Sequence, residues 1–437
     1  MAITGSIGIV ADDLTGANDT ALQFFMRGAN TKIIFDAKNC TNKDSNVDVW
    51  SLSTETRNTG AKHAAKEVWD GASGLRENLG VENFYKKIDS TLRGNVAIET
   101  LSMLDAIGYD AAIIAPAFIQ EGRITIGGYQ LLKGIPIERT DAARDTYAPI
   151  YDSYIPDILK KQINENLYNT IGTIELKTVT KGAFGITNKL AELIENNKKL
   201  IVVDAVSLVD LEQIALSIEK SQYKILPVGS AGLAGALSNI WHQNTESENI
   251  KKEIPVLPKL ILSGSKTSIT KTQIDKLKLD DDIDNTYFID LCLDDILDAN
   301  YENMSKRIVQ NLGKDNIVVV HVNKIEEELN ADKNHERLVD EGITKESLGY
   351  KITDYLSELA KLTNKEAEYI LITIGGETSY KCTNAIDCRC LKVIDGILPA
   401  ISLCIDTNSK FIVTKSGNMG AACALIDIIN YFKYHEK

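Results

Sequence analysis

The feature that most constrains this chain is a repeated alternation of short apolar runs with longer, helix-like stretches. Ile7–Val10, Asp110–Ala115 and Leu200–Val203 are such runs, whereas Leu22–Arg27 and Leu208–Lys220 are helix-like. This alternation is typical of α/β folds with parallel sheets. We therefore predict an α/β fold with largely parallel sheets. Because open α/β sheets bind ligands at the carboxyl ends of their strands, we expect the functional site in the turns that follow these runs.

A change of composition divides the chain into two parts. Residues 242–258 (HQNTESENIKKEIPVLP) are polar and then carry two prolines, which is typical of a linker. The chain has 437 residues, and domains usually contain roughly 100–200 residues. Because the alternation resumes after the linker, we predict two α/β domains, residues 1–245 and 256–437.

Composition and charge argue against several classes of protein. The net charge is −13, whereas a general nucleic-acid binder usually carries a basic balance. No apolar run reaches the roughly 18 residues of a spanning helix, and Asp12 and Asp13 would interrupt the apolar part of a signal peptide. The 7 cysteines lack the spacing of a zinc site or a disulfide framework. We therefore expect a cytoplasmic protein that binds neither nucleic acid nor membranes.

Two adjacent acids follow the first predicted strand, in the segment 7–19 (IGIVADDLTGAND). An aspartate at a strand end can accept hydrogen bonds from substrate hydroxyls, act as a base or bind Mg²⁺ through oxygen. Asp12 and Asp13 would point in opposite directions in an extended chain. We therefore expect one of them to cap the following helix and the other to work in the site.

The segment 85–95 (YKKIDSTLRGN) brings charged and hydroxyl side chains together after another strand: Lys87, Asp89, Ser90, Thr91 and Arg93. Arg57, in the sequence TETR, is a further cation. Arginine binds a carboxylate with two hydrogen bonds, and neighbouring hydroxyls can fix its orientation. This set favours a site for a carboxylate ligand, and the alternative is a helix start held by ion pairs.

Two further segments have ambiguous patterns. Residues 115–128 (APAFIQEGRITIGG), with Arg144 and Asp145 soon after, are expected to form a long polar loop. That loop is either functional or held by an Arg–Asp pair. The segment 229–235 (GSAGLAG) lacks the G-x-G-x-x-G spacing of a dinucleotide site, so close packing of a helix on a sheet explains it equally well.

Strand-like runs in the C-terminal half end in turns that are rich in Gly, Ser and Thr: 260–268 (LILSGSKTS), 370–380 (ILITIGGETSY) and 411–420 (FIVTKSGNMG). The first lacks the spacing of a P-loop. Backbone N–H groups and hydroxyls at such turns can still hold a phosphate. We predict that these turns converge on the nucleotide, with these candidates: Ser265, Gly375, Gly376, Glu377, Thr378, Lys415, Gly417 and Gly420.

The residues alone favour a two-domain kinase for a small acidic substrate. Phosphoryl transfer depends on positioning, Mg²⁺ and charge neutralisation more than on an unusual nucleophile. Arg57, Lys87 and Arg93 would bind the carboxylate, and Asp12 would orient or deprotonate the hydroxyl. Asp13 and Asp89 are alternative candidates for the base.

The same segments closely resemble the four-carbon acid sugar kinase family, in family order and over nearly the whole chain. They are ADDLTGAND (11–19), TETR (54–57), KKIDSTLRGN (86–95), PAF (116–118), GRITIGGY (122–129), ARD (143–145), VGSAGLAGAL (228–237), SGSKTS (263–268), GGETS (375–379) and KSGNMG (415–420). The resemblance implies transfer of phosphate from ATP to the 4-hydroxyl of a four-carbon sugar acid, with Mg²⁺. D-Threonate and D-erythronate are the expected substrates, and a 3-oxo-tetronate is the alternative.

The resemblance also implies an arrangement of the site. The N-terminal domain would hold the acid and the C-terminal domain the nucleotide, in the cleft between them. Asp12, Arg57 and the run Lys87, Ile88, Asp89 and Ser90 match substrate-binding positions. Ser265, the Gly375–Thr378 turn and Gly420 match ATP-binding positions. The oligomeric state is left open, with a homodimer among the alternatives.

Some residues depart from the family pattern. Lys266 stands where the family usually has Cys, Glu377 where it has Asp, and Met419 where it has Phe.

Two rival functions are alternatives to the kinase. A dinucleotide-dependent oxidoreductase or isomerase lacks its glycine motif here. A non-catalytic sugar-acid or nucleotide sensor would be expected to lose the charged set, which this chain keeps.

Overall fold

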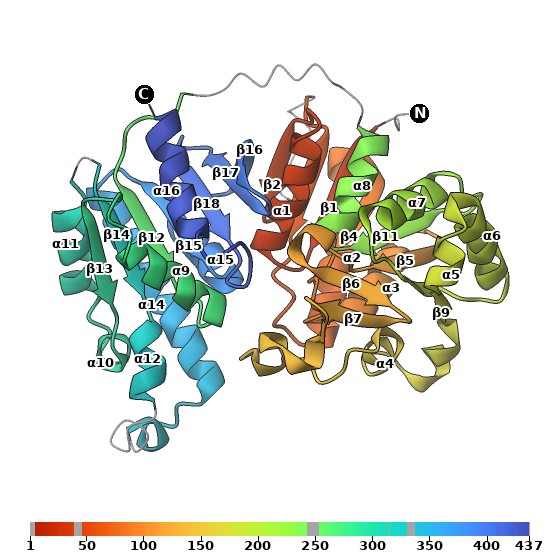
Figure 1. The fold of residues 1–437 in the computed structure, drawn as a ribbon, viewed down its shortest axis with the longest axis horizontal. Helices are drawn as coiled ribbons and strands as arrows, with labels where there is room; N and C mark the ends of the chain where they lie inside the picture. Colours follow the sequence, from red (N-terminus) through yellow and green to blue (C-terminus); the bar gives the residue numbers. More distant parts are fainter. Residues whose placement is uncertain (1–4, 39–45, 243–252, 314, 330–336, 437) are drawn as a thin grey trace. The chain divides into compact units, whose positions relative to one another are not determined.

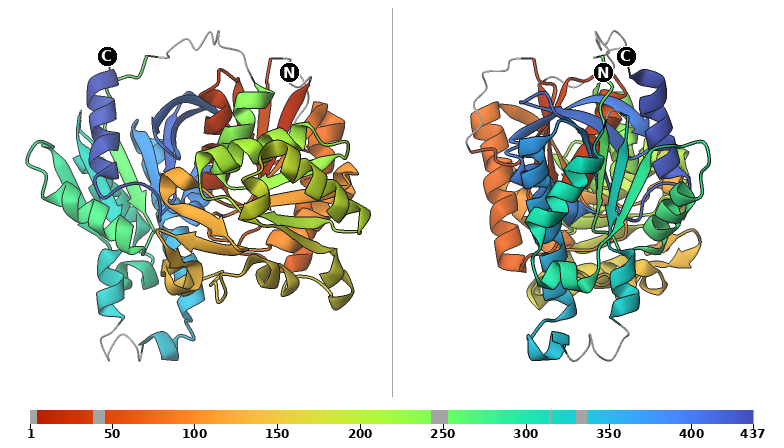
Figure 2. Two further views of the ribbon diagram at one scale, coloured as in Figure 1. Left: turned by 45° about the vertical axis from the view of Figure 1, so that its right-hand side comes forward. Right: turned by 90° about the vertical axis from the view of Figure 1, so that its left-hand side faces the viewer.

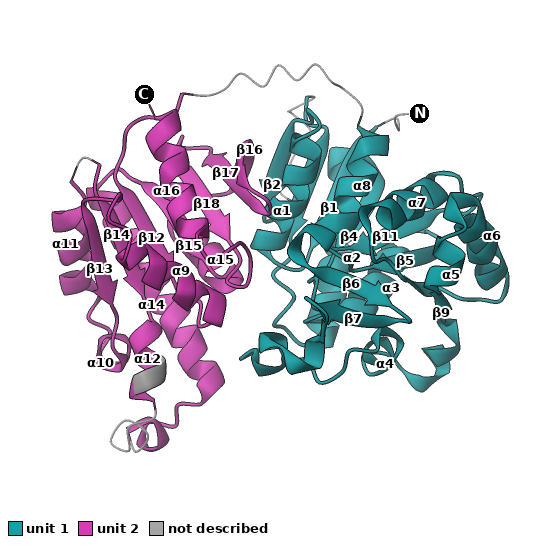
Figure 3. Ribbon diagram, viewed as in Figure 1, with its two compact units in different colours: residues 1–249 teal, residues 250–437 magenta. Residues whose placement is uncertain are grey.

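The computed structural model describes residues 5–38, 46–242, 253–313, 315–329 and 337–436. The chain forms two compact units, residues 1–249 and 250–437 (Figure 3). The predicted domain limits at residues 245 and 256 stay a prediction, because part of the segment between them lies outside the described residues. Among the described residues, no helix is both long enough and apolar enough to cross a membrane.

The main sheet of unit 1 consists of parallel strands in the order β2-β3-β1-β4-β11-β5-β10-β9. Every residue of β3, β5 and β10 is buried, as expected for strands covered on both faces. The strands are β1 (Ser6–Ala11), β2 (Thr31–Ile34), β3 (Val49–Ser53), β4 (Val81–Lys87), β5 (Ala111–Ala115), β9 (Ile171–Ile174), β10 (Leu200–Val203) and β11 (Ile225–Gly229).

Helices cover both faces of this sheet (Figures 1 and 2). Contacts join α1 to α8, α8 to α7 and α7 to α6 on one face, and α2 to α3 on the other. Side chains at the N-caps help to set their starts: Asp13 for α1, Ser207 for α7 and Ser230 for α8. The helices are α1 (Leu14–Phe25), α2 (Ala61–Leu79), α3 (Val96–Ile107), α4 (Ile155–Lys160), α5 (Leu176–Val179), α6 (Gly182–Glu195), α7 (Leu208–Glu219) and α8 (Ala231–Trp241).

The expectation of a long loop at residues 115–128 is wrong. The segment contains η1 (Ile119–Glu121) and then β6 (Arg123–Ile126), which pairs with β7 (Tyr129–Leu132) in an antiparallel hairpin. Both turn glycines between the strands have positive φ, which suits the tight turn of a two-residue hairpin. The remaining short elements are β8 (Ile135–Pro136), η2 (Ile137–Arg139), η3 (Asp141–Arg144) and η4 (Glu165–Thr170).

Unit 2 has a mixed sheet in the order β13-β14-β12-β15-β18-β17-β16. The strands from β13 to β18 in this order are parallel, and β17 and β16 add antiparallel pairs. The strands are β12 (Lys259–Ser263), β13 (Thr286–Asp290), β14 (Ile317–His321), β15 (Ile370–Ile374), β16 (Cys390–Leu398), β17 (Ile401–Asp406) and β18 (Phe411–Lys415).

The helices of unit 2 also lie on both faces of its sheet (Figures 1 and 2). Contacts join α9 to α16 on one face, and α14 to α10, α11 and α15 on the other. The prediction of α/β units with largely parallel sheets is confirmed. The helices are α9 (Ser268–Lys278), α10 (Leu293–Leu297), α11 (Tyr301–Asn311), α12 (Asn323–Glu328), α14 (Lys345–Glu366), α15 (Gly376–Ala385) and α16 (Ala424–His435).

Candidate active site

The turn after β1 and the loop after β3 meet at the guanidinium of Arg57. Its Nε and Nη2 donate to Asp12 Oδ2 and Oδ1, each at 2.8 Å. Its Nη1 donates to Asp13 Oδ2 at 2.6 Å. Because β1 and β3 are parallel neighbours, their carboxyl ends bring these residues together from positions far apart in the sequence.

Asp13 is the aspartate that caps α1. Its Oδ1 accepts from the backbone N–H of Gly16 at 2.9 Å, and its Oδ2 accepts from the hydroxyl of Thr15 at 2.7 Å. Although Asp12 and Asp13 are adjacent residues, both carboxylates bind the same guanidinium. Burial by itself would raise the pKa of Asp13, but Arg57 and Lys87 outweigh burial and lower this pKa.

A second ionic cluster forms after β4. Arg93 Nε donates to Asp89 Oδ2 at 2.8 Å, Nη2 donates to Asp89 Oδ1 at 2.9 Å, and Nη1 donates to Asp145 Oδ2 at 2.7 Å. The hydroxyl of Thr91 also donates to Asp89. Burial opposes ionisation of Asp89, yet Arg93 and Arg57 hold its pKa well below the usual value. Asp89 is therefore an ionised carboxylate at neutral pH.

The loops that carry the two clusters are packed against each other. Gly94 has a φ of 89°, and a Cβ there would lie 3.1 Å from the carbonyl oxygen of Arg57. Asn95 Nδ2 donates to the carbonyl oxygens of Thr56 and Thr59 at 3.0 and 2.9 Å. These contacts fix the loop of the second cluster beside the loop that carries Arg57.

Lys87 ends β4 beside the start of α1, and its side chain is buried. A Cβ on Gly16 would lie 2.6 Å from its Nζ, so the ammonium lies against the first turn of α1. Among the described residues, no hydrogen bond or ion pair joins this ammonium to another side chain. Ile88 is buried and donates its backbone N–H to Gly229. Ser90 is buried, and its carbonyl oxygen accepts from Gln130 at 2.8 Å.

Sequence reasoning missed the buried ion pair of Lys86 and Glu99, which joins β4 to the first turn of α3. Lys86 Nζ lies 2.8 Å from Glu99 Oε2 and donates to the carbonyl oxygen of Lys87 at 2.9 Å. The only signal in the sequence is that charged residues stand inside two elements that are otherwise largely apolar. The pair holds the end of β4 in place, directly before the residues of the site.

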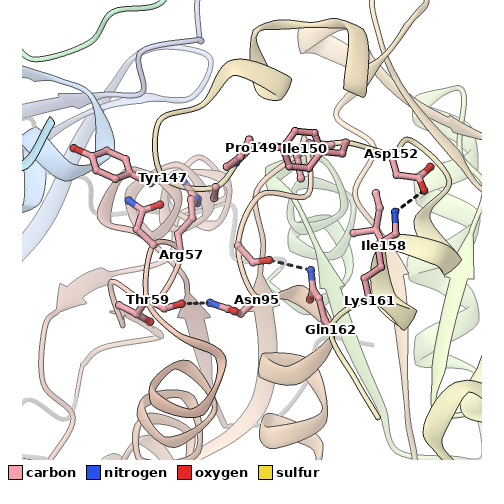
Figure 4. Close-up of a pocket in the computed structure, with 14 residues that line it drawn as sticks. Arg57, Thr59, Asn95, Tyr147, Pro149, Ile150, Asp152, Ile158, Lys161 and Gln162 are labelled. Carbon is pink, nitrogen blue, oxygen red and sulfur yellow. Dashed lines mark hydrogen bonds and ion pairs between the residues drawn. The ribbon is translucent and has the colours of Figure 1, made fainter. Parts of the chain in front are cut away.

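A cavity of about 300 Å³ adjoins Arg57 in unit 1 (Figure 4). Arg57, Thr59 and Asn95 line one side, and the segment 147–152 lines another. Lys161, which also lines the cavity, donates to Asp152 at 3.0 Å. The walls are therefore partly polar and partly apolar, and a small molecule could reach the neighbourhood of Arg57 from this side.

In unit 2, the turns after β12 and β18 are joined by hydroxyl groups. Ser265 Oγ lies 2.9 Å from Thr270 Oγ1. The hydroxyls of Thr267 and Thr270 donate to the carbonyl oxygen of Gly417 at 2.6 and 2.7 Å. A Cβ on Gly417 would overlap Ser265 Oγ, so only glycine permits this approach.

The turn after β15 lies beside the same group. Gly375 has a φ of 112° and is the N-cap of α15, whose first residue is Gly376. A Cβ on Gly264 would overlap the hydroxyl of Thr378. Two helix N-termini, those of α9 and α15, thus begin at adjacent strand ends, and such termini attract anions.

Two other predicted nucleotide-binding residues are held within unit 2. Lys415 is fully buried, and its ammonium donates to the carbonyl oxygen of Ser416 at 3.0 Å. Gln273 Nε2 donates to the carbonyl oxygens of Met419 and Ala421 at 3.2 and 2.8 Å, which anchors the turn on both sides of Gly420. The side chain of Met419 is buried.

Within the described residues, no group of three or more His, Cys, Asp or Glu side chains is arranged to hold a metal ion. Glu377 is half-buried on the first turn of α15, 3.8 Å from the ammonium of Lys381. Mg²⁺ in nucleotide sites is usually held by one or two carboxylates together with phosphate oxygens. The carboxylate of Glu377 fits that requirement.

Asp19 is a further buried acid that sequence reasoning did not single out. It lies on α1, and Gln23 Nε2 donates to its Oδ1 at 3.5 Å. Burial raises the pKa of Asp19 to about 7, an effect that Lys87 reduces and Glu121 increases. The only sequence signal was its place at the end of the acidic segment 11–19.

Comparison with known protein families matches both units. The family model of a sugar-binding N-terminal domain matches residues 7–237. The family model of a nucleotide-binding C-terminal domain matches residues 260–425. The ionic clusters thus lie within the first match, and the turns after β12, β15 and β18 lie within the second.

Similar proteins extend over almost the whole chain. A D-erythronate kinase from Heliobacterium modesticaldum is 29% identical, over 97% of this chain and 97% of its own length. A D-threonate kinase from Salmonella typhimurium is 27% identical, over 97% of this chain and 98% of its own length. A 3-oxo-tetronate kinase from Brucella melitensis is 26% identical, over 95% and 93%.

Two solved structures share the fold. A Salmonella typhimurium protein has a TM-score of 0.76 at 22% identity and matches 97% of this chain and 98% of its own. A Haemophilus influenzae protein has a TM-score of 0.69 at 22% identity and matches 97% and 100%. These similarities confirm the α/β fold.

Proposed function

Since the chain belongs to the four-carbon acid sugar kinase family, we propose that it transfers the γ-phosphoryl group of ATP to a four-carbon sugar acid. The observation that carries this proposal is that each unit matches a domain model of the family and has residues that suit the ligand of that domain at its strand ends. Unit 1 matches a sugar-binding domain and has a buried ionic cluster at its strand ends. Unit 2 matches a nucleotide-binding domain and has glycine and hydroxyl turns at helix N-termini.

The proposed acceptor is the 4-hydroxyl of D-threonate or D-erythronate, and a 3-oxo-tetronate is the alternative. The names of the similar kinases support these acids. The ammonium of Lys87 would bind the substrate carboxylate, because it is a buried cation without an internal partner among the described residues. The carboxylates held by Arg57 and Arg93 would accept hydrogen bonds from the substrate hydroxyls.

The phosphates of ATP would bind at the turns of Ser265, Gly375–Thr378 and Gly417. Backbone N–H groups and the dipoles of α9 and α15 offer positive potential there. Mg²⁺, which Glu377 would help to hold, neutralises phosphate charge when bound. Lys415 would support its turn from within, since its ammonium is bonded to a backbone carbonyl.

The test is release of ADP, measured with ATP and Mg²⁺ against D-threonate, D-erythronate, their L-isomers and 3-oxo-tetronates. We expect one acid to give turnover well above all the others. Stereoisomers differ by one or two contacts, so discrimination of roughly 10–200-fold is expected. Turnover with none of these acids, by folded protein that binds ATP, would refute a four-carbon substrate.

A further inference from the structure

The three acids that the sequence predicts as candidates for the base, Asp12, Asp13 and Asp89, are poorly suited to accept a proton. Asp12 is held by two hydrogen bonds from Arg57, and Asp89 by two from Arg93. Asp13 accepts from Arg57, Thr15 and the backbone of Gly16. The cations hold the pKa values of Asp13 and Asp89 below normal, and a carboxylate of low pKa is a weak base.

Asp19 differs from these acids in its contacts. It is three residues after Gly16 on α1, so both lie on the same face of the helix. That face is directed towards Lys87, because a Cβ on Gly16 would lie 2.6 Å from the Lys87 ammonium. Within the described residues, no arginine or lysine forms an ion pair with Asp19. Its Oδ2 accepts no hydrogen bond from any described residue. It is therefore a buried carboxylate with an oxygen available beside the proposed anchor of the substrate.

The surroundings of Asp19 tune it for proton transfer near neutral pH. Its pKa is about 7, which permits a carboxylate that is both populated and basic. The charged and titratable groups that act on it come from several elements: Lys87 and Tyr85 of β4, Glu121 of η1, Arg123 of β6 and Asp13 at the start of α1.

We propose that Asp19 is the catalytic base, which accepts the proton of the substrate hydroxyl during phosphoryl transfer; this inference rests on the function proposed above. The hydroxyl oxygen forms a bond to the γ-phosphorus of ATP, and the bond from that phosphorus to the β–γ bridging oxygen breaks. ADP leaves with the electron pair of that bond. The hydroxyl proton passes to the carboxylate of Asp19, from which water removes it after turnover.

The test compares Asp19→Asn with the wild type on the acid that gives turnover. Asparagine keeps the shape of the side chain but cannot accept the proton. We expect kcat to fall at least 100-fold, with KM for ATP and for the acid changed by less than 3-fold. Asp105→Asn, in which an exposed acid on α3 is replaced, is the matched control and should keep full activity.

The dependence of kcat on pH separates a base from a structural residue. In the wild type, kcat should fall roughly tenfold for each pH unit below the Asp19 transition near pH 7. This limb should be absent from the residual activity of Asp19→Asn and displaced in Asp19→Glu.

A wild-type kcat that stays constant from pH 5 to 8 would overturn the proposal without any variant. A kcat of Asp19→Asn within 3-fold of the wild-type value would also overturn it. So would a kcat of Asp19→Asn that falls below pH 7 as the wild-type kcat does. Absence of wild-type turnover with every four-carbon acid would refute both the function and this role.

Discussion

At the scale of single residues, the site depends on carboxylates that arginines keep ionised inside the protein. In Arg93→Met, Asp89 would lose both guanidinium hydrogen bonds while remaining buried. Breaking a buried ion pair in this way costs roughly 3–5 kcal/mol. We expect the free energy of unfolding, measured by urea denaturation at pH 7, to fall by that amount. Arg139→Met, which breaks an exposed pair with Glu138, is the control and should change the free energy of unfolding by less than about 1 kcal/mol. Equal losses of this free energy in the two variants would contradict the prediction.

Asp19 should give the protein a distinctive dependence of stability on pH. Burial raises its pKa in the folded state from the usual 3.8 to about 7, so the unfolded chain loses this proton at lower pH than the folded protein does. Ionisation therefore favours the unfolded state increasingly between pH 4 and 7, by up to about 4 kcal/mol. We expect Asp19→Asn to become more stable than the wild type over that interval, with a constant difference above it. Urea denaturation at several pH values measures this difference, and a difference independent of pH would refute it.

Sequence reasoning found the charged residues that directly follow strands, because parallel sheets bring such positions to one edge. It selected Arg57 and Asp89 for this reason. It could not find Asp19 or the pair of Lys86 and Glu99, whose importance depends on burial and on neighbours distant in the sequence. Nor could it foresee that Arg57 bridges both aspartates, since the reach of a guanidinium depends on the path of the loop after β3.

At the scale of elements, the turns of unit 2 depend on glycines that permit close approach of the backbone. A Cβ on Gly417 would overlap Ser265 Oγ and separate the turns after β12 and β18. We expect Gly417→Ala to weaken ATP binding at least 10-fold, which is about 1.4 kcal/mol. Isothermal titration calorimetry measures this change. Gly60→Ala, where a Cβ would meet no atom within 4 Å, should bind ATP like the wild type. Unchanged affinity in Gly417→Ala would exclude this turn from the ATP site.

The alternation of strands and helices allowed the elements around the site to be predicted well. The hairpin of β6 and β7 was the exception. Glu121, Arg123 and the paired glycines make this segment polar, and a polar segment with paired glycines favours the prediction of a loop. The missed signal is the alternation of polar and apolar residues in β6, directly before the two-glycine turn of Gly127 and Gly128. Asp204, at the end of β10, holds that turn by accepting from both glycine N–H groups at 2.8 and 2.9 Å, a contact between distant segments.

At the scale of the whole molecule, the two units carry different chemistry, so each ligand should depend on its own unit. A ligand at 100 times its Kd stabilises the folded state by about 2.7 kcal/mol, which appears as a rise in Tm. Lys87→Met removes an ammonium in unit 1, whereas Gly417→Ala distorts a turn in unit 2. We expect Lys87→Met to lose most of the Tm rise given by the sugar acid and to keep the rise given by ATP. Gly417→Ala should keep the rise given by the sugar acid and lose about half or more of the rise given by ATP. Thermal denaturation of the full chain, with each ligand alone, measures all four combinations. Loss of both responses in either variant would contradict the assignment of acid and nucleotide to separate units.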